Sequence, residues 1–188
     1  QKDSGADSEF PGVDDDCDGG IDEDGVRVGD LVVSELFPLP GQLQAAYIEV
    51  ANEGDRTVYL DGWSVTINGR EMPIPDGETL LAGDFLLFCD DAGLAKNWGC
   101  DFEWSPGLSF GAASGSVVVQ SPTLSVDSLK WNAGWDFQAA VALELSATAH
   151  SSSENDRLEN WCPSETGLDG GGFGSPGQLN RECLVGLR

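Results

Sequence analysis

From Asp30 onward, short apolar runs alternate with turn residues, a pattern typical of all-β proteins. β-Branched and aromatic residues fill the runs, and glycine, proline, asparagine and aspartate fill the gaps between them. The pattern predicts strands at 31–36, 46–51, 58–60, 63–67, 85–88, 117–120, 128–131 and 141–145. Segments 47–50 and 63–67 alternate apolar and polar positions, which predicts one buried and one solvated face for each.

Little helix is expected. A single helical turn is predicted near 91–96, and a second turn follows His150. After Trp161 the chain is too rich in glycine to form a strand, so we expect a surface strap there. Many short strands with almost no helix predict a β-sandwich.

Residues 1–29 differ from the rest of the chain in composition. They are acidic and rich in glycine, with few apolar side chains, which predicts a leader that is irregular unless an ion orders it. The 188 residues are enough for one ordinary domain and a short appendage. We therefore expect a leader at 1–29, a β-sandwich domain at 30–183 and a C-terminal tail at 184–188.

The leader contains the start of a calcium loop. Its aspartates alternate and a glycine follows, so that carboxylates, one backbone carbonyl and a sharp turn can surround a hard cation. The expected Ca²⁺ ligands are Asp14, Asp16, Asp18, Gly20 through its carbonyl, Asp22 and Asp24. Gly25 stands where the loop would place a bidentate acid, and Glu23 or Asp24 is the candidate substitute. The alternative is a solvated acidic linker, because blocks of like charge are usually disordered.

The overall charge excludes some partners. Nine Lys and Arg residues face 33 Asp and Glu residues, giving a formal charge of −24, and the basic residues are scattered. A phosphate-neutralising patch is therefore missing, which argues against nucleic acid and anionic membranes and favours divalent cations. No apolar run approaches the roughly 20 residues that span a bilayer. The start of the chain has no signal-peptide pattern, so we expect any signal peptide to have been removed.

The five cysteines favour an oxidising compartment. Cys89 and Cys100 bracket a polar loop that a disulfide could close, and Cys162 and Cys183 bracket the glycine-rich segment. Cys17 is then left over within the acidic leader, which suggests a bond to another chain or to a missing segment. The alternative is that all five are small buried apolar residues.

An ordered series of segments resembles the exported bacterial form of the lamin tail domain. The series includes LVVSELFPLP at 31–40, AAYIEVANEGDRTVYLDGWSVT at 45–66, LLAGDFLLFCD at 80–90, LSFGAASGSVVVQ at 108–120, VDSLKWN at 126–132, ALELSATAHSSSENDRLENWC at 142–162 and FGSPGQLN at 173–180. The resemblance covers about residues 30–183. It implies an immunoglobulin-like β-sandwich that binds or scaffolds and does not catalyse, although exported bacterial members often accompany nucleases, phosphatases or proteases on longer chains.

The leader is similar to a second pattern, the short Asp/Cys metal-binding repeat found beside such domains in surface proteins of myxobacteria-like organisms. The core of that repeat is GxDxDCDGxxDE, with a second cysteine seven residues upstream. Phe10 occupies that place here, so Cys17 lacks the partner that the repeat implies. The metal-binding carboxylates are retained.

Hydrolase and zinc chemistry are poorly supported. The single histidine, His150, lies beside Ser151, but a triad is assembled from separate segments and no GxSxG elbow is present. We expect His150 to be an exposed loop residue. One histidine and cysteines without CxxC spacing cannot supply the soft ligands of a zinc site.

Carboxylates and tryptophans offer two further candidate sites. Among 33 acids, a pair for glycoside hydrolysis would need to converge in an aromatic cleft. Trp98, Trp104, Trp131 and Trp135 could line such a cleft or a glycan platform, although core packing explains Trp63 and Trp131 and the Cys100 loop explains Trp98 and Trp104. Other acidic positions are Asp90, Asp91, Asp127 and Asp169; an additional ion at the Asp90–Asp91 loop is the alternative to a solvated loop. Gly170–Gly172 lacks the lysine and helix of a phosphate loop.

The sequence therefore predicts a secreted or cell-surface, calcium-binding structural module that is not an enzyme. Its expected partners are other protein chains, including copies of itself in a fibre or layer. A lectin-like module that binds glycans and an accessory domain of a secreted hydrolase are the alternatives.

Overall fold

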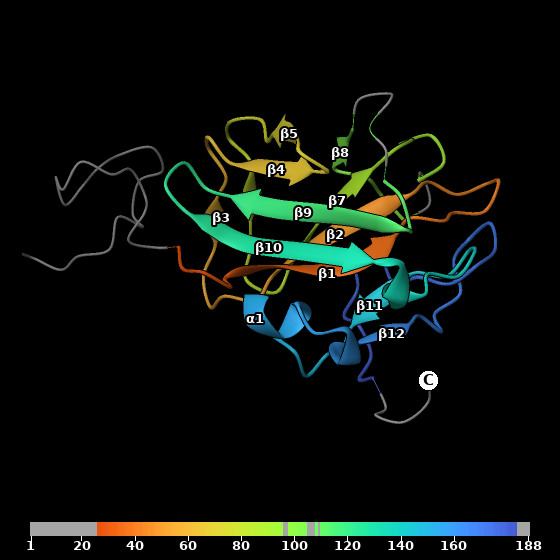
Figure 1. The fold of residues 1–188 in the computed structure, drawn as a ribbon. Helices are drawn as coiled ribbons and strands as arrows, with labels where there is room; N and C mark the ends of the chain where they lie inside the picture. Colours follow the sequence, from red (N-terminus) through yellow and green to blue (C-terminus); the bar gives the residue numbers. More distant parts are fainter. Residues whose placement is uncertain (1–25, 96–97, 105–107, 109, 184–188) are drawn as a thin grey trace, which may run out of the picture.

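Two β-sheets pack face to face in the computed structural model, which describes residues 26–95, 98–104, 108 and 110–183 (Figure 1). The larger sheet has the order β12-β11-β1-β2-β7-β8 and the smaller has the order β10-β9-β4-β5. The larger sheet contains β1 (Leu31–Phe37), β2 (Tyr47–Asn52), β7 (Phe85–Cys89), β8 (Phe102–Glu103), β11 (Leu143–Leu145) and β12 (Trp161–Pro163). The smaller contains β4 (Ser64–Ile67), β5 (Arg70–Pro73), β9 (Ser114–Gln120) and β10 (Ser125–Asn132), and β3 (Val58–Tyr59) pairs separately with β6 (Thr79–Leu80). The all-β sandwich expected from the sequence is confirmed.

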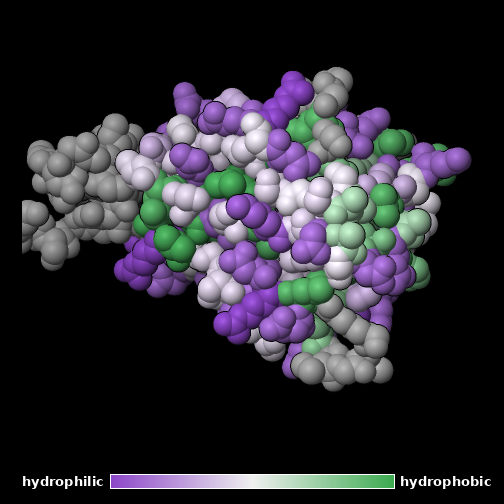
Figure 2. All heavy atoms as spheres, viewed as in Figure 1, coloured by the Kyte–Doolittle hydropathy of each residue, from purple (hydrophilic) through white to green (hydrophobic). Residues whose placement is uncertain are grey.

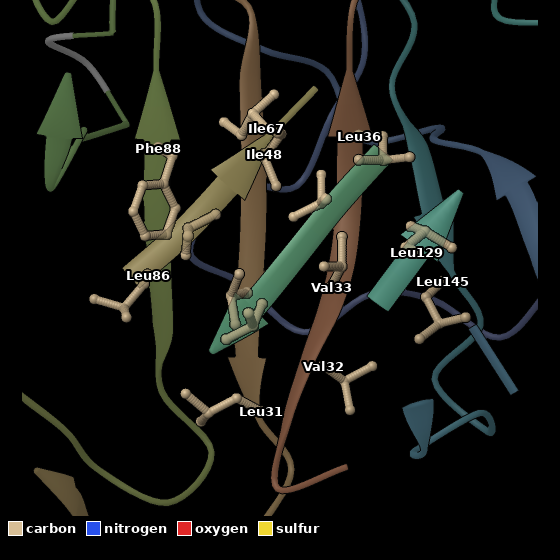
Figure 3. Packing of buried hydrophobic residues seen from close by; sticks show 14 of the residues in the cluster. Leu31, Val32, Val33, Leu36, Ile48, Ile67, Leu86, Phe88, Leu129 and Leu145 are labelled. Atoms are coloured by element: carbon tan, nitrogen blue, oxygen red, sulfur yellow. The ribbon is translucent and has the colours of Figure 1, made fainter. Parts of the chain in front are cut away.

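Branched and aromatic side chains from both sheets fill the space between them. Figure 3 shows Val33 and Leu36 of β1, Ile48 of β2 and Phe88 of β7 directed toward this space, together with Ile67 of β4. These residues are at most 1% exposed. Burial of such side chains contributes roughly 1.5–3 kcal/mol each and holds the two sheets together.

The larger sheet is also covered on its outer face, by a second and smaller apolar cluster. Its members are Phe37, Ala45, Tyr47, Leu87, Cys89, Ala95 and Ala142, with Trp98, Cys100 and Leu168 packed against them. As a result every residue of β1 and β2 is buried. The expectation of a solvated face at 47–50 is therefore wrong, because loops from distant parts of the sequence cover that face.

A glycine-rich segment supplies part of this cover. Residues 164–183, which we call the strap, follow β12 and run over the outer face of the larger sheet, joined to Ala140 and Ala142 by backbone hydrogen bonds from and to Phe173. The strap forms no strand, as expected, but it is more than a surface segment. Its central residues Gly174, Ser175 and Pro176 are buried.

Several local expectations can be compared with the structure. The turn after His150 is α1 (Ser152–Asn155), with short 3₁₀ helices η2 at Ala133–Trp135 and η3 at Leu158–Asn160. The described part of 91–96 is a hydrogen-bonded turn in which the amides of Leu94 and Ala95 donate to Asp91 O. The sequence did not predict the short strands β5, β6, β8 and β12.

A buried acid links the two sheets at one side of the sandwich. Asp127 Oδ2 in β10 accepts a 2.8 Å hydrogen bond from the Val33 amide and a 2.7 Å bond from Asn155 Nδ2. The Val33 contact lies at the irregularity in the pairing of β1 with β2. Asp127, which the sequence marked only as an acidic position, therefore links β10, β1 and α1.

The expected disulfides are both present. Cys89 is bonded to Cys100, and Cys162 is bonded to Cys183. The second bond joins β12 to the end of the strap, so it fixes both ends of that segment. Within the part of the chain that the structure describes, none of the helices has the length and apolar character needed to cross a bilayer.

Candidate functional site

Three buried glutamates lie side by side on the outer face of the larger sheet. Strand register places Glu35 of β1 opposite Glu144 of β11 and opposite Glu49 of β2. All three are fully buried. Adjacent strands lie about 4.8 Å apart, so three like charges in this row would repel one another strongly. We call Glu35, Glu49 and Glu144 the carboxylate cluster.

The strap supplies most of the hydrogen-bond donors for this cluster. The Ser175 amide donates to Glu35 Oε1 at 2.9 Å, and the Gly177 amide donates to Glu49 Oε2 at 2.7 Å. The Ser34 hydroxyl donates to the other oxygen of Glu49 at 2.7 Å. The cluster therefore holds the strap through its backbone amides.

Glu144 has the only basic partner that the structure describes for the cluster. Arg181 Nε donates to Glu144 Oε1 at 2.8 Å, and the same guanidinium lies 3.4 Å from the exposed Glu165. Ser175 Oγ lies 2.9 Å from both Glu144 Oε2 and Asn180 Oδ1, although a hydroxyl has one proton to donate. The cluster thus has three acids for one cation and is short of donors.

Burial changes the protonation of the cluster. It raises the pKa of Glu35 well above its usual range, and the neighbouring Glu49 and Glu144 carboxyls raise it further, against the opposing hydrogen bond from Ser175. Burial also raises the pKa of Glu49 to about 7, although Ser34 and Gly177 oppose the shift. At least part of the cluster is therefore protonated near neutral pH.

Tyr47 borders the cluster on the β2 side. Burial raises the pKa of its hydroxyl well above the usual range, and the Glu35 charge adds to this effect. The hydroxyl interacts with the Glu35 carboxyl, yet neither Tyr47 Oη nor Glu35 Oε2 has a hydrogen bond of regular geometry. A Cβ atom at Gly174 would overlap Tyr47 Oη and lie 3.3 Å from Glu35 Oε1, so only glycine fits there.

The arrangement suits a structural role better than acid–base catalysis. A general acid needs to reach a substrate, and the cluster is covered by the strap, with Gly174, Ser175 and Pro176 buried above it. Among the described residues no three His, Cys, Asp or Glu side chains are placed to hold a metal ion. We therefore interpret the cluster as the group of side chains that holds the strap against the sheet.

A groove on the surface offers a site that solvent can reach. It lies between the edge strands β5 and β8 and has a volume of about 370 Å³. Met72 and Phe102 provide apolar surface, and Glu71, Asp101 and Glu103 provide negative charge beside Arg70. This lining suits a partner segment that presents apolar and basic side chains.

The remaining surface is mostly polar. Figure 2 shows hydrophilic residues over much of the face in view, with hydrophobic residues in several separate groups between them. Among the described residues, the large apolar side chains with the greatest exposure are Val28, Leu39, Leu43, Leu81, Leu94, Phe173 and Leu179. Leu39 and Phe173 both bond through their backbones to Ala140, so they lie at the same end of the larger sheet.

The expected calcium ligands lie outside the described residues. Asp14, Asp16, Asp18, Gly20, Asp22 and Asp24, and Cys17 with them, precede Val26. The described chain begins next to the sandwich, because Val26 packs against the main core and the Gly29 amide donates to Val126 O at 3.0 Å. Residues 26–29 therefore lie against the sandwich beside β10.

Other candidate residues have local roles. His150 has a 59% exposed side chain, as expected, and its Nδ1 lies 2.7 Å from Glu53 Oε2. Asp90 Oδ1 accepts from the Ala46 amide, and burial raises the pKa of this acid. Asp91 and Asp169 are exposed. Gly170, Gly171 and Gly172 all have positive φ, and Gln44 Nε2 donates to Gly171 O.

The tryptophans do not form an exposed platform. Trp104, Trp131 and Trp135 are at most 7% exposed and belong to the main core. Trp98 is half-buried, and its ring lies 4.9 Å from that of Tyr47. The expected core packing of Trp63 and Trp131 is confirmed, and Trp98 packs in the same cluster as Cys100, whereas Trp104 belongs to the main core and not to that loop.

The carboxylate cluster was not among the candidates from sequence. A signal was present, because Glu35, Glu49 and Glu144 each stand inside an apolar run: LVVSELF, AYIEVA and ALEL. A charged residue flanked on both sides by strand-forming apolar residues can mark a buried acid that needs a partner.

Comparison with known proteins identifies no relative: no family model, no curated protein and no solved structure matches this chain.

Proposed function

We propose that this protein is an extracellular, non-catalytic interaction module of the lamin-tail, immunoglobulin-like type, with a calcium-binding leader. The observation that carries the proposal is the position of Glu35 and Glu49. The pKa values of both are raised, which is the usual mark of a catalytic acid, but both are hydrogen-bonded beneath the strap. Because these acids hold the strap in place and do not face solvent, they support a structural role, in which the domain is a rigid scaffold for binding.

The two disulfides support an oxidising location outside the cytoplasm. Cys89–Cys100 closes the loop that covers one part of the outer face, and Cys162–Cys183 fixes the strap over another. Such bonds form and persist in exported proteins. We therefore propose secretion or display at the cell surface.

The leader is the proposed calcium site. Its alternating aspartates supply the oxygen ligands that Ca²⁺ prefers. The chain that follows is anchored, with the Arg27 amide donating to Asp30 Oδ2 at 2.8 Å and the Gly29 amide donating to β10. A leader ordered by the ion would therefore have a fixed position at this end of the sandwich.

The groove between β5 and β8 is the proposed partner site. The edge strands argue against open-ended strand addition, because Pro73 lies in β5, Pro163 lies in β12, and β8 has only two residues. A partner protein that inserts apolar and basic side chains into the groove suits its lining better. The proposed partner is another protein chain, and a second copy of this chain is one such partner.

The test is binding of the intact protein to an array of extended peptides, with and without Ca²⁺, comparing wild type with Glu71→Lys. We expect selection of peptides that carry apolar and basic side chains and loss of that selection in the variant. Asp76→Lys, an exposed change outside the groove, is the control. Binding that shows no sequence preference, or that Glu71→Lys leaves unchanged, would contradict the groove. Size-exclusion chromatography with Ca²⁺ and with EGTA tests self-association, and identical monomeric profiles would count against it.

A further inference from the structure

Two buried polar atoms, one in the carboxylate cluster and one beside it, have no hydrogen-bond partner of regular geometry. They are Glu35 Oε2 and Tyr47 Oη, and both side chains are fully buried. Both side chains lie under the strap at Gly174, because a Cβ atom there would overlap Tyr47 Oη and lie 3.3 Å from Glu35 Oε1. The Tyr47 hydroxyl interacts with the Glu35 carboxyl and opposes the rise of its pKa, but three buried carboxyls still face a single guanidinium among the described residues. Ionisation of all three would leave buried charge without a partner, so a proton or a cation must compensate the cluster.

A proton fits this position better than a metal ion. Calcium takes six to eight oxygen ligands. The oxygens of Glu49 and Glu144 and Oε1 of Glu35 already face N–H or O–H donors from Ser34, Ser175, Gly177 and Arg181. A cation would have to displace these donors, whereas a proton needs only Glu35 Oε2, which accepts from none of them. A protonated Oε2 would donate to Tyr47 Oη, and an ionised one would accept from it.

We propose that a proton on Glu35 fastens the middle of the strap to the sheet, and that its loss releases Gly174–Gly177 from the carboxylate cluster. The released segment stays attached at both ends, because Cys162–Cys183 closes the strap into a loop. Release would uncover the outer face of β1, β2 and β11. The domain would thus present two surfaces, one with the strap seated and one with the strap lifted.

The charges that face Glu35 determine the direction of the switch. An ionised Glu35 faces the carboxyls of Glu49 on β2 and Glu144 on β11, which raise its pKa, whereas the Tyr47 hydroxyl on β2 donates to it and lowers its pKa. Within the described part of the chain, Arg181 on the strap is the one cation that contacts the cluster, and it is already paired with Glu144 and Glu165. Asp84 and Asp101 line a cavity beside Gly177 and carry charge of the same sign. Repulsion and desolvation therefore outweigh the two amide hydrogen bonds, and the strap is released as the pH rises.

The test is amide hydrogen exchange of the full chain between about pH 5 and about pH 9, with protection factors calculated against intrinsic exchange rates at each pH. For peptides that cover 174–178, we expect wild-type protection to fall at least about tenfold over this range, as loss of a shared proton requires. Glu35→Gln is uncharged and of the same shape, so its protection should fall clearly less than that of wild type, with the remaining decrease due to Glu49. Glu159→Gln, at an exposed position, should behave like wild type. A flat wild-type profile, or a Glu35→Gln profile that falls like wild type, would overturn the proposal.

A second measurement needs no variant. In wild-type protein labelled at glutamate carboxyl carbons, the Glu35 resonance should keep its neutral-form shift at about pH 6, where an ordinary glutamate is ionised. An ionised shift at that pH would overturn the proposal. Repeating the exchange series with Ca²⁺ on Asp16→Ala, in which the leader site is removed, distinguishes a cation from a proton. Protection restored by Ca²⁺ at high pH would mean that the cluster takes a cation, and the proposal would fail.

Discussion

The Gly177 amide donates a 2.7 Å hydrogen bond to Glu49 Oε2, joining residues 128 positions apart in the sequence. The other oxygen of Glu49 accepts from the Ser34 hydroxyl of the neighbouring strand. One side chain therefore aligns β1, β2 and the strap. Because amide-to-carboxylate bonds are directional, they determine the position of the strap more closely than apolar packing alone would.

The first expectation concerns the close approach of the strap to Tyr47. Gly174→Ala would place a methyl group in contact with Tyr47 Oη and near Glu35 Oε1, which the packed site cannot accept without moving the strap. We expect the free energy of unfolding to fall by about 1–3 kcal/mol. Chemical denaturation measures the change. Gly167→Ala is the control, because nothing lies within 4 Å of its Cβ position; equal midpoints for the two variants would contradict the packing described.

The second expectation concerns pH. The pKa of Glu49 is raised from 4.5 to about 7 in the folded protein, so the folded state binds more protons than the unfolded state between these values. Stability is then greatest below about pH 4.5 as far as this group is concerned, and it falls as pH rises through about 7. The raised pKa values of Glu35 and Asp127 act in the same direction.

A shift of this size corresponds to a loss of up to about 3 kcal/mol from Glu49. The lowered pKa of the exposed Glu154 acts in the opposite direction, and solvent screening makes its effect small. Urea unfolding at about pH 5 and about pH 8 measures the difference. We expect a lower midpoint at the higher pH, and stability that increases over this interval would contradict the protonated cluster.

The third expectation concerns the link between the sheets. Asp127→Ala would leave the Val33 amide and the Asn155 side-chain amide without their acceptor in a buried site. We expect a loss of about 2–4 kcal/mol in the free energy of unfolding. Asp55→Ala is the control, since that side chain is 96% exposed and its ion pair with Arg56 contributes little. Comparable losses in both variants would mean that Asp127 does not join the sheets.

The fourth expectation separates the two disulfides. Replacing Cys162 and Cys183 by serine frees one end of the strap, and replacing Cys89 and Cys100 does not. Each bond closes a short loop, with sequence separations of 21 and 11, so each replacement should cost about 3 kcal/mol of stability. Hydrogen exchange distinguishes them: only the first replacement should expose the Ser175 and Gly177 amides. Unchanged strap protection in that variant would show that the carboxylate cluster alone holds the segment.

The strands and the disulfides could be predicted because their signals are local. Residues 31–36 and 46–51 are apolar runs bounded by turn residues, and each run became a strand within a residue or so of the expected bounds. Cys89 and Cys100 bracket a short loop, as do Cys162 and Cys183. By contrast β8 and β6 contain two residues each, and their strand character comes from their pairing partners.

The burial of Glu49 could not be read from its own strand. Alternation of Tyr47, Ile48, Glu49 and Val50 predicts a wetted face, and that prediction fails because the strap, which begins more than a hundred positions later, covers it. Asp127 is a similar case, since its partners Val33 and Asn155 come from other elements. The burial of an acid depends on tertiary contacts that strand periodicity does not encode.

The most direct test of the proposed function is a calorimetric titration of the intact chain with Ca²⁺. We expect saturable binding by wild type, at least about tenfold weaker binding by Asp16→Ala, and unchanged binding by Asp7→Ala, a leader aspartate outside the alternating series. Absence of binding heat in wild type, or equal affinity in the two variants, would contradict a calcium-binding leader.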